Sequence, residues 1–219
     1  MRLQSAIFDM DGTLLDSMRI WNDLGPSLLR SMGIEPAPDL GPRLMLMTFR
    51  DGAALCKEEY HLSQTVEEIM DMAKSKVRAF YENEVQPKPG VRKFLSLLKM
   101  EGVWMYVATN TDRDLVESAL KHTGLDSYFR GILTCVEVGA GKKDSPEIYE
   151  RCMRRLRSTK KDTVIFEDAL HAIQTAKAAG FRVCAVYDPS AEADQEEIKA
   201  LSDYYIRSFE EMFETETLE

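Results

Sequence analysis

The chain has 219 residues, with 28 lysines and arginines against 37 aspartates and glutamates, and its formal net charge is -9. That length suits one large domain, or a core domain that carries a smaller insert, with a sizeable buried core. The acidic balance argues against a protein that binds nucleic acid through a broadly basic surface, so no nucleic-acid partner is expected. A phosphorylated small molecule would instead need positive charge that is local to a site.

No apolar run approaches the length of about 20 residues that a helix needs to cross a bilayer, and the first four residues lead directly into an apolar run. We therefore expect a soluble, cytoplasmic protein without a membrane partner. The four cysteines form no C-x-x-C pair, so we expect reduced, buried thiols rather than a zinc site or a disulfide framework. These cysteines are Cys56, Cys135, Cys152 and Cys184.

Two carboxylates follow the first short apolar run of the chain, residues 5–8. Asp9 and Asp11 stand two residues apart where the chain turns at Gly12, and parallel α/β sheets place their sites at the carboxyl ends of strands. An aspartate there can attack an electrophile such as phosphorus, while the second acid serves as general acid and base. Thr13 offers a hydroxyl and a backbone amide that can hold the acids in place. An ordinary Asp-Gly turn after a strand explains the same residues.

From residue 17 to residue 86 the pattern changes to helical periodicity, without a convincing strand. Helices are expected over 18–33, 45–60 and 65–81, with Ser63 as the N-cap of the third. An all-helical insert between two strands is typical of a cap domain.

Two arginines of this insert, Arg43 and Arg50, flank an apolar segment in a loop-to-helix region. They are the basic residues of the insert best placed to meet an anionic substrate, although solvated surface arginines fit the same pattern. We retain Arg50 as a candidate substrate contact of the cap.

The chain returns to a strand pattern after a Pro-Lys-Pro-Gly boundary at residues 87–90. Residues 103–108 form an apolar run that ends in Thr109-Asn110-Thr111, and a run that is apolar on both faces fits a central parallel strand. Its polar end is then expected beside Asp9, where hydroxyl and amide N–H groups can hold phosphoryl oxygens and a helix beginning near Asp112 adds its N-terminal dipole. An N-cap with an Asx turn fits as well, and the geometry permits both.

Charged residues also follow two later strand patterns. Lys143 lies in a glycine-rich loop after the run 131–134 and can reach an oxyanion as a point charge, although surface loops are rich in lysines. The run 163–166 ends in Glu167-Asp168. Asp168 supplies a second oxygen ligand near Asp9, and this pair with a backbone carbonyl and waters suits octahedral Mg²⁺. Without a cation the crowded acids would repel one another.

Strand patterns continue at 181–186 and 204–206, and they alternate with helical patterns. This alternation, with polar residues at successive strand ends, predicts an α/β fold with a doubly wound, Rossmann-like parallel sheet. The expected core comprises residues 1–16 and 87–219, and the expected helical cap comprises residues 17–86.

Four short motifs, in order, make the chain resemble the haloacid dehalogenase-like hydrolase superfamily over nearly its whole length. The motifs are Asp9-Met10-Asp11-Gly12-Thr13, Thr109-Asn110, Lys143 with Pro146, and Glu167-Asp168. The helical insert is similar to the small cap of the phosphoglycolate phosphatase and β-phosphoglucomutase branch. The chain departs from the family at Lys143-Asp144, where Lys-Pro is usual. Lys142 competes for the role, but the spacing to Pro146 favours Lys143.

The resemblance implies a role for each matching residue. Asp9 would be the nucleophile that forms an aspartyl-phosphate, and Asp11 the general acid and then the base. Thr109 and Lys143 would bind the phosphoryl group. The implied ligands of Mg²⁺ are Asp9, the backbone carbonyl of Asp11, and Asp168, with Glu167 beside them.

The expected activity is Mg²⁺-dependent hydrolysis of a small phosphomonoester by a monomer or weak dimer. Displacement of a halide needs no proton, so the acid at Asp11 favours phosphoryl transfer to oxygen over dehalogenation. A sugar phosphomutase of the β-phosphoglucomutase type is an alternative, which is weakened by the apolar Leu46 near where that branch uses a lysine. A non-catalytic module that binds a phosphorylated metabolite is the other.

Overall fold

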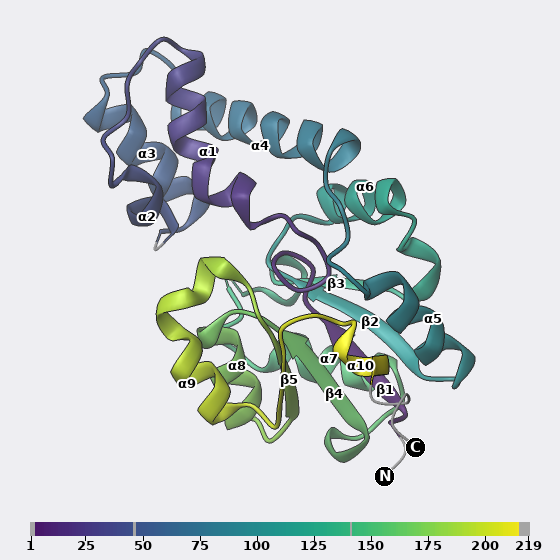
Figure 1. The fold of residues 1–219 in the computed structure, drawn as a ribbon. Helices are drawn as coiled ribbons and strands as arrows, with labels where there is room; N and C mark the ends of the chain where they lie inside the picture. Colours follow the sequence, from purple (N-terminus) through teal and green to yellow (C-terminus); the bar gives the residue numbers. More distant parts are fainter. Residues whose placement is uncertain (1–2, 46, 141, 215–219) are drawn as a thin grey trace. The chain divides into compact units, whose positions relative to one another are not determined.

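The computed structural model describes residues 3–45, 47–140 and 142–214 (Figure 1). Leu46, which the sequence analysis used, and Gly141, in the glycine-rich loop before Lys143, lie outside the described residues. The chain divides into two units, one that combines Met1–Asp16 with Val85–Glu219 and one that comprises Ser17–Glu84. The role of the second unit as a cap stays a prediction.

Six parallel strands form the sheet of the first unit, in the order β3-β2-β1-β4-β5-β6. In chain order they are β1 (Ser5–Phe8), β2 (Trp104–Thr109), β3 (Ile132–Thr134), β4 (Thr163–Glu167), β5 (Arg182–Val186) and β6 (Tyr204–Ile206). The chain builds the sheet outward from β1 in one direction and then returns to build it from β4 in the other. This reversal confirms the predicted doubly wound sheet and puts its topological switch point beside β1.

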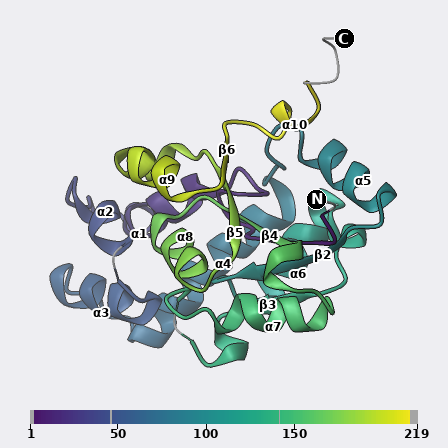
Figure 2. The ribbon, with the colours of Figure 1, turned by 90° about the horizontal axis from the view of Figure 1, so that it is seen from below.

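Helices cover both faces of this sheet (Figures 1 and 2). They are α5 (Val91–Met100), α6 (Arg113–Thr123), α7 (Glu147–Arg155), α8 (Leu170–Ala178), α9 (Gln195–Leu201) and the short α10 (Glu211–Glu214). Because side chains alternate along a strand, each strand feeds both layers. Ile7 and Ile165 belong to an apolar cluster with residues of α7, α8 and α9, while their neighbours Phe8 and Phe166 face the opposite layer.

Aromatic rings pack the two central strands, β1 and β4, against each other on that opposite face. The rings of Phe8 and Phe166 stack with their centroids 4.5 Å apart, and the ring of Phe94, on α5, meets Phe166 edge-on at 5.4 Å. Such pairs add to the free energy gained from burial alone. Each of the two stacked residues immediately precedes an acidic residue, so the packing fixes where Asp9 and Glu167 leave the sheet.

The described residues of the second unit form four helices, α1 (Met18–Ser31), α2 (Leu40–Met45), α3 (Phe49–Glu59) and α4 (Val66–Asn83). The expectation of one helix over 45–60 was wrong at its start, because Thr48 caps α3 by accepting from the backbone N–H of Asp51. The choice of Ser63 as N-cap was also wrong. Thr65 caps α4 in a reciprocal capping box with Glu68, which satisfies two helix-end donors at once.

No helix in the described ranges has both the length and the apolar character that crossing a bilayer requires. All four cysteines are buried and free of disulfide bonds.

The close approach of Gly90 to the C-terminal segment leads to a prediction about stability. Gly90 has a φ of +79°, and a Cβ built on it would lie 2.5 Å from the backbone nitrogen of Glu210 and 2.7 Å from the carbonyl carbon of Phe209. Gly102 provides a matched control, because its φ is +77° and nothing lies within 4 Å of its Cβ position.

We expect Gly102→Ala to lower the free energy of unfolding by about 1 kcal/mol, from the left-handed backbone alone. Gly90→Ala should lower it by at least about 3 kcal/mol, because rigid backbone atoms must also move. Urea unfolding followed by circular dichroism measures both losses. Equal losses in the two variants would contradict the steric argument.

Candidate active site

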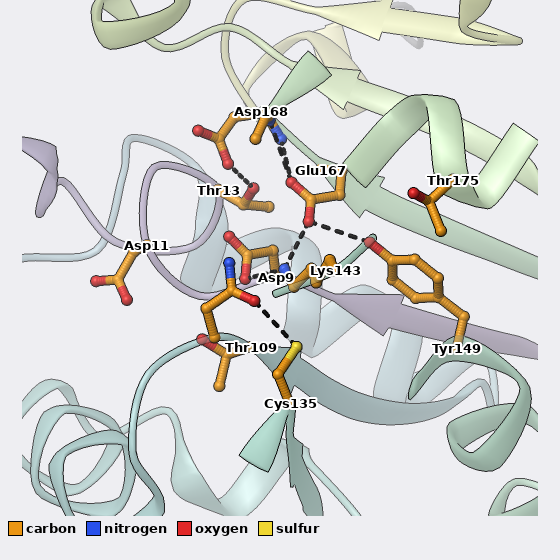
Figure 3. A network of polar contacts seen from close by, with 12 residues as sticks. Asp9, Asp11, Thr13, Thr109, Cys135, Lys143, Tyr149, Glu167, Asp168 and Thr175 are labelled. Carbon is orange, nitrogen blue, oxygen red and sulfur yellow. Dashed lines mark hydrogen bonds and ion pairs between the residues drawn. The ribbon is translucent and has the colours of Figure 1, made fainter. Parts of the chain in front are cut away.

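The carboxyl ends of the central strands bring together the acidic and hydroxyl residues that the sequence singled out. Asp9 directly follows β1, Thr109 ends β2, and Glu167-Asp168 spans the end of β4. Since β1 pairs with both β2 and β4, these residues meet around Asp9 at the switch point of the sheet (Figure 3). Such an edge is where open α/β sheets bind ligands.

Lys143 lies at the centre of this group, although it comes from the loop that follows β3. Its ammonium donates to Oδ1 of Asp9, and it donates to Oε1 of Glu167 at 2.5 Å. Only 1% of Lys143 is exposed. Burial by itself would lower the pKa of Lys143, but the charges of the two carboxylates outweigh it, so this pKa lies above its ordinary value. Lys143 therefore remains a cation.

Glu167 binds this lysine through a carboxylate, and hydrogen bonds to both of its oxygens fix its position. Besides Lys143, Oε1 accepts a hydrogen bond from the buried hydroxyl of Tyr149 at 3.3 Å. Oε2 accepts from the backbone N–H groups of Asp168 at 2.9 Å and of Ala169 at 3.2 Å. With both oxygens engaged, Glu167 acts as an anchor for Lys143 and has little capacity left for another ligand.

The acidic cluster contains more buried negative charge than Lys143 can balance. Asp9, Glu167 and Asp168 each offer a carboxylate oxygen, and these oxygens lie within 4.8 Å of one another. Burial raises the pKa of Asp9 to about 7 and holds the pKa of Asp168 well above its ordinary value. A set of hard oxygen donors with excess negative charge fits a divalent cation such as Mg²⁺. Since Glu167 is engaged, Asp9 and Asp168 are the carboxylates suited to hold it.

Two threonine hydroxyls orient the remaining acids. Thr13 donates to Oδ1 of Asp168 at 2.8 Å, and Thr111 donates to Oδ2 of Asp11 at 2.7 Å. The side chain of Asp11 lies apart from the cluster around Asp9 (Figure 3). The two aspartates of the first motif therefore occupy different surroundings, with Asp9 among buried charges and Asp11 half-exposed beside a hydroxyl.

The end of β2 and the loop after it carry the candidate phosphate-binding residues, Thr109 and Asn110. The hydroxyl of Thr109 accepts from the backbone N–H of Thr111 at 3.2 Å, which closes a tight polar turn before α6. The side-chain carbonyl of Asn110 accepts from the thiol of Cys135 at 3.0 Å. Asn110 itself is exposed at this edge of the sheet, so it is accessible to an anion.

Two basic residues that the sequence analysis also considered, Lys142 and Arg50, take no part in the hydrogen bonds and ion pairs that the described residues form around Asp9. Lys142 is half-buried, and its neighbour Lys143 is the lysine beside Asp9. Arg50, on α3 of the second unit, is exposed and forms an ion pair with Glu67 at 2.5 Å. Its role as a substrate contact stays a prediction.

The sequence analysis gave no individual role to three residues that the structure places in the polar network: Thr111, Tyr149 and Cys135. Thr111 was visible as the last residue of the polar run that ends the second strand. Tyr149 and Cys135 gave no comparable signal, because a tyrosine in an amphipathic helix and a single cysteine usually indicate packing alone.

Residues 6–186 match a family model described as haloacid dehalogenase-like hydrolase. A protein of Thermotoga maritima named phosphorylated carbohydrates phosphatase is 28% identical over 178 residues, which are 81% of this chain and 82% of the relative. Hexitol phosphatase B of Escherichia coli K12 is 27% identical over 88% of this chain and 87% of the relative.

The fold has a close structural counterpart as well. The crystal structure of CbbY from Rhodobacter sphaeroides in complex with phosphate superimposes with a TM-score of 0.80 over 96% of each chain, at 22% sequence identity. Together with the match over most of the sequence, the relatives confirm the expected enzyme class, a phosphatase. This chain belongs to the haloacid dehalogenase-like hydrolase family.

Proposed function

We propose that this protein hydrolyses a small phosphomonoester with the help of Mg²⁺, through an aspartyl-phosphate formed on Asp9. The observation that carries the proposal is the buried contact of Lys143 with Asp9 and Glu167, next to Asp168. This arrangement combines a nucleophile, a fixed cation and a candidate metal site at one strand end. Relatives named for phosphorylated carbohydrates and for hexitol support a phosphorylated sugar or sugar alcohol as the substrate class.

The reaction consists of two displacements at phosphorus. In the first, a carboxylate oxygen of Asp9 forms a bond to phosphorus while the bond from phosphorus to the ester oxygen breaks, and Asp11 gives its proton to that leaving oxygen. In the second, Asp11 takes a proton from a water molecule, whose oxygen bonds to phosphorus as the bond to Asp9 breaks. Phosphate leaves, and both aspartates return to their starting states.

The surrounding groups stabilise negative charge on the phosphoryl group during transfer. Lys143 supplies a fixed positive charge, while Thr109 and Asn110 supply hydrogen-bond donors. Bound Mg²⁺, held by Asp9, Asp168 and the carbonyl of Asp11, would neutralise charge on the phosphoryl oxygens. In this proposal the helical unit Ser17–Glu84 acts as a cap that limits access of bulk water, and Arg50 is its candidate contact with substrate.

Replacement of the nucleophile tests the proposal directly. We expect Asp9→Asn to reduce phosphate release at least about a thousandfold, because an amide cannot form the covalent intermediate. The measurement is Mg²⁺-dependent phosphate release from a panel of sugar phosphates, sugar alcohol phosphates, nucleotides and phosphoglycolate. Isomerised products are followed in parallel, since isomerisation without net release would identify a phosphomutase. Full activity in the variant would remove Asp9 from its proposed role.

The adjacent lysines provide a matched pair of variants. Lys143→Met removes the buried positive charge beside Asp9, so we expect kcat to fall about a hundred- to a thousandfold. Lys142→Met removes the same charge one residue away and should leave kcat within about twofold, since a half-exposed charge contributes little. Circular dichroism confirms that both variants fold. Similar losses in kcat for the two would contradict the assignment of Lys143.

The raised pKa of Asp9 predicts how pH changes stability. In the metal-free folded protein this pKa is about 7 against an ordinary value of 3.8, so the folded state holds a proton that the unfolded chain releases. The contribution of this group to stability should therefore be lost as pH rises from about 4 to about 7.

Because Mg²⁺ displaces that proton, its stabilising effect should grow over the same pH window. We expect a larger rise in Tm on addition of Mg²⁺ at pH 7.5 than at pH 5.0, measured by scanning fluorimetry. Asp9→Asn lacks one of the two carboxyl groups whose pKa is raised, since that of Asp168 is raised as well, so it should show a smaller difference between the two pH values. A rise in Tm that is independent of pH in the intact protein would show that Asp9 does not compete with the metal for a proton.

A further inference from the structure

Cys135, which directly follows β3, forms two separate hydrogen bonds to the candidate phosphate-binding residues Thr109 and Asn110. Its thiol donates to Oδ1 of Asn110 at 3.0 Å, and its backbone N–H donates to the carbonyl of Thr109 at 2.9 Å. Only 1% of Cys135 is exposed. The backbone of this residue therefore binds the last residue of β2, and its side chain binds the loop that follows that strand.

The thiol contact determines which end of the Asn110 amide is free. An asparagine side chain has one carbonyl oxygen, which accepts, and one amino group, which donates. Burial raises the pKa of the Cys135 thiol to about 11, so the sulfur keeps its proton and acts as a donor at neutral pH. The carbonyl end is thus held toward the buried sulfur. Because Asn110 is exposed, its amino group is the end that remains available to a ligand.

The segment that bears Cys135 is itself fixed by a second bridge to the start of α6. The guanidinium of Arg113 forms a two-point contact with Glu137, from Nε to Oε1 at 2.6 Å and from Nη2 to Oε2 at 2.8 Å. Glu137 also accepts from the backbone N–H of Thr134 at 2.9 Å. The thiol is therefore presented to Asn110 from a braced turn, which is the requirement for a residue that orients another.

We propose that Cys135 is a positioning residue for phosphoryl binding, whose thiol holds the Asn110 carbonyl inward so that the Asn110 amino group donates to a phosphoryl oxygen. The inference rests on the proposed function and adds a residue to it. In the flipped orientation the amide would present a carbonyl oxygen to the anion, and two acceptors that face one another repel. The contribution of Cys135 is thus to exclude the unproductive orientation.

Cys152 offers a matched control for packing. Cys135 and Cys152 are both buried members of the same apolar cluster, but Cys152 lies within α7, whereas Cys135 contacts the loop after β2. Truncation of either cysteine to alanine removes one buried sulfur. An effect confined to Cys135→Ala would therefore come from its hydrogen bond to Asn110.

The test measures the affinity for inorganic phosphate by calorimetry in the presence of Mg²⁺, together with KM and kcat for the best substrate. We expect Cys135→Ala to weaken phosphate binding and to raise KM about three- to tenfold, with a smaller change in kcat, as for one hydrogen bond of modest strength. Cys135→Ser keeps a donor and should restore both constants to within about twofold. Cys152→Ala should change neither.

A double-mutant cycle with Asn110→Ala identifies the route of the effect. If Cys135 acts through Asn110, Cys135→Ala should cause no further loss of phosphate affinity once Asn110 is alanine. The same fold-loss in both backgrounds, or an equal loss from Cys152→Ala, would overturn the inference. So would an absence of phosphate binding by the intact protein.

Failure of the proposed function is distinguishable from these results. In that case the intact protein would bind inorganic phosphate with the expected dependence on Cys135 and Asn110, yet release no phosphate from any substrate of the panel. Conversely, an active phosphatase that shows no dependence on the thiol would sustain the proposed function and reject the role of Cys135.

Discussion

The buried contact of Lys143 with Asp9 and Glu167 is the interaction on which the rest of the site depends. Three charged groups have left water here, and a buried charge that loses its partner is strongly destabilising. The lysine and the two carboxylates must therefore come together in the folded state, although they lie at residues 9, 143 and 167 of the chain. The sheet supplies this convergence, because β1 and β4 are neighbours and end at the same edge.

Packing beneath the site makes this convergence reproducible. The stacked rings of Phe8 and Phe166 fix the carboxyl ends of the two strands, and the residue that follows each ring, Asp9 or Glu167, reaches the site. Glu167 then uses both of its oxygens to hold Lys143 and to bind the start of the following turn. The aromatic packing and the ion pairs of Lys143 therefore depend on each other. A shift of either strand end would separate Lys143 from Asp9 or from Glu167.

The sequence predicted most of the fold and the acidic core of the site, but not how the side chains are held. Apolar runs marked the strands because buried parallel strands need apolar residues on both faces, and the acids stood out as charges at the ends of these runs. The hydroxyl of Tyr149 and the thiol of Cys135 gave no signal, since a tyrosine in an amphipathic helix and a single cysteine usually indicate packing alone, whereas in the structure they bind Glu167 and Asn110. The choice of Ser63 as the N-cap of α4 was wrong. Thr65 caps this helix instead, in a reciprocal pair with Glu68 that satisfies two helix-end donors.

The first motif illustrates how one kind of side chain can serve two purposes. Asp9 lies among buried charges, where a lysine and a bound cation would favour its ionised, nucleophilic form. Asp11 is only two residues away but half-exposed, and a threonine hydroxyl holds it, which gives it the access to solvent that the proposed acid and base needs. Separation of two carboxylates into unlike environments is the general way in which one fold obtains both a nucleophile and an acid-base group. The turn at Asp11-Gly12 separates the two carboxylates within three residues of the end of β1. A motif of five residues can therefore supply both the proposed nucleophile and the proposed acid-base group.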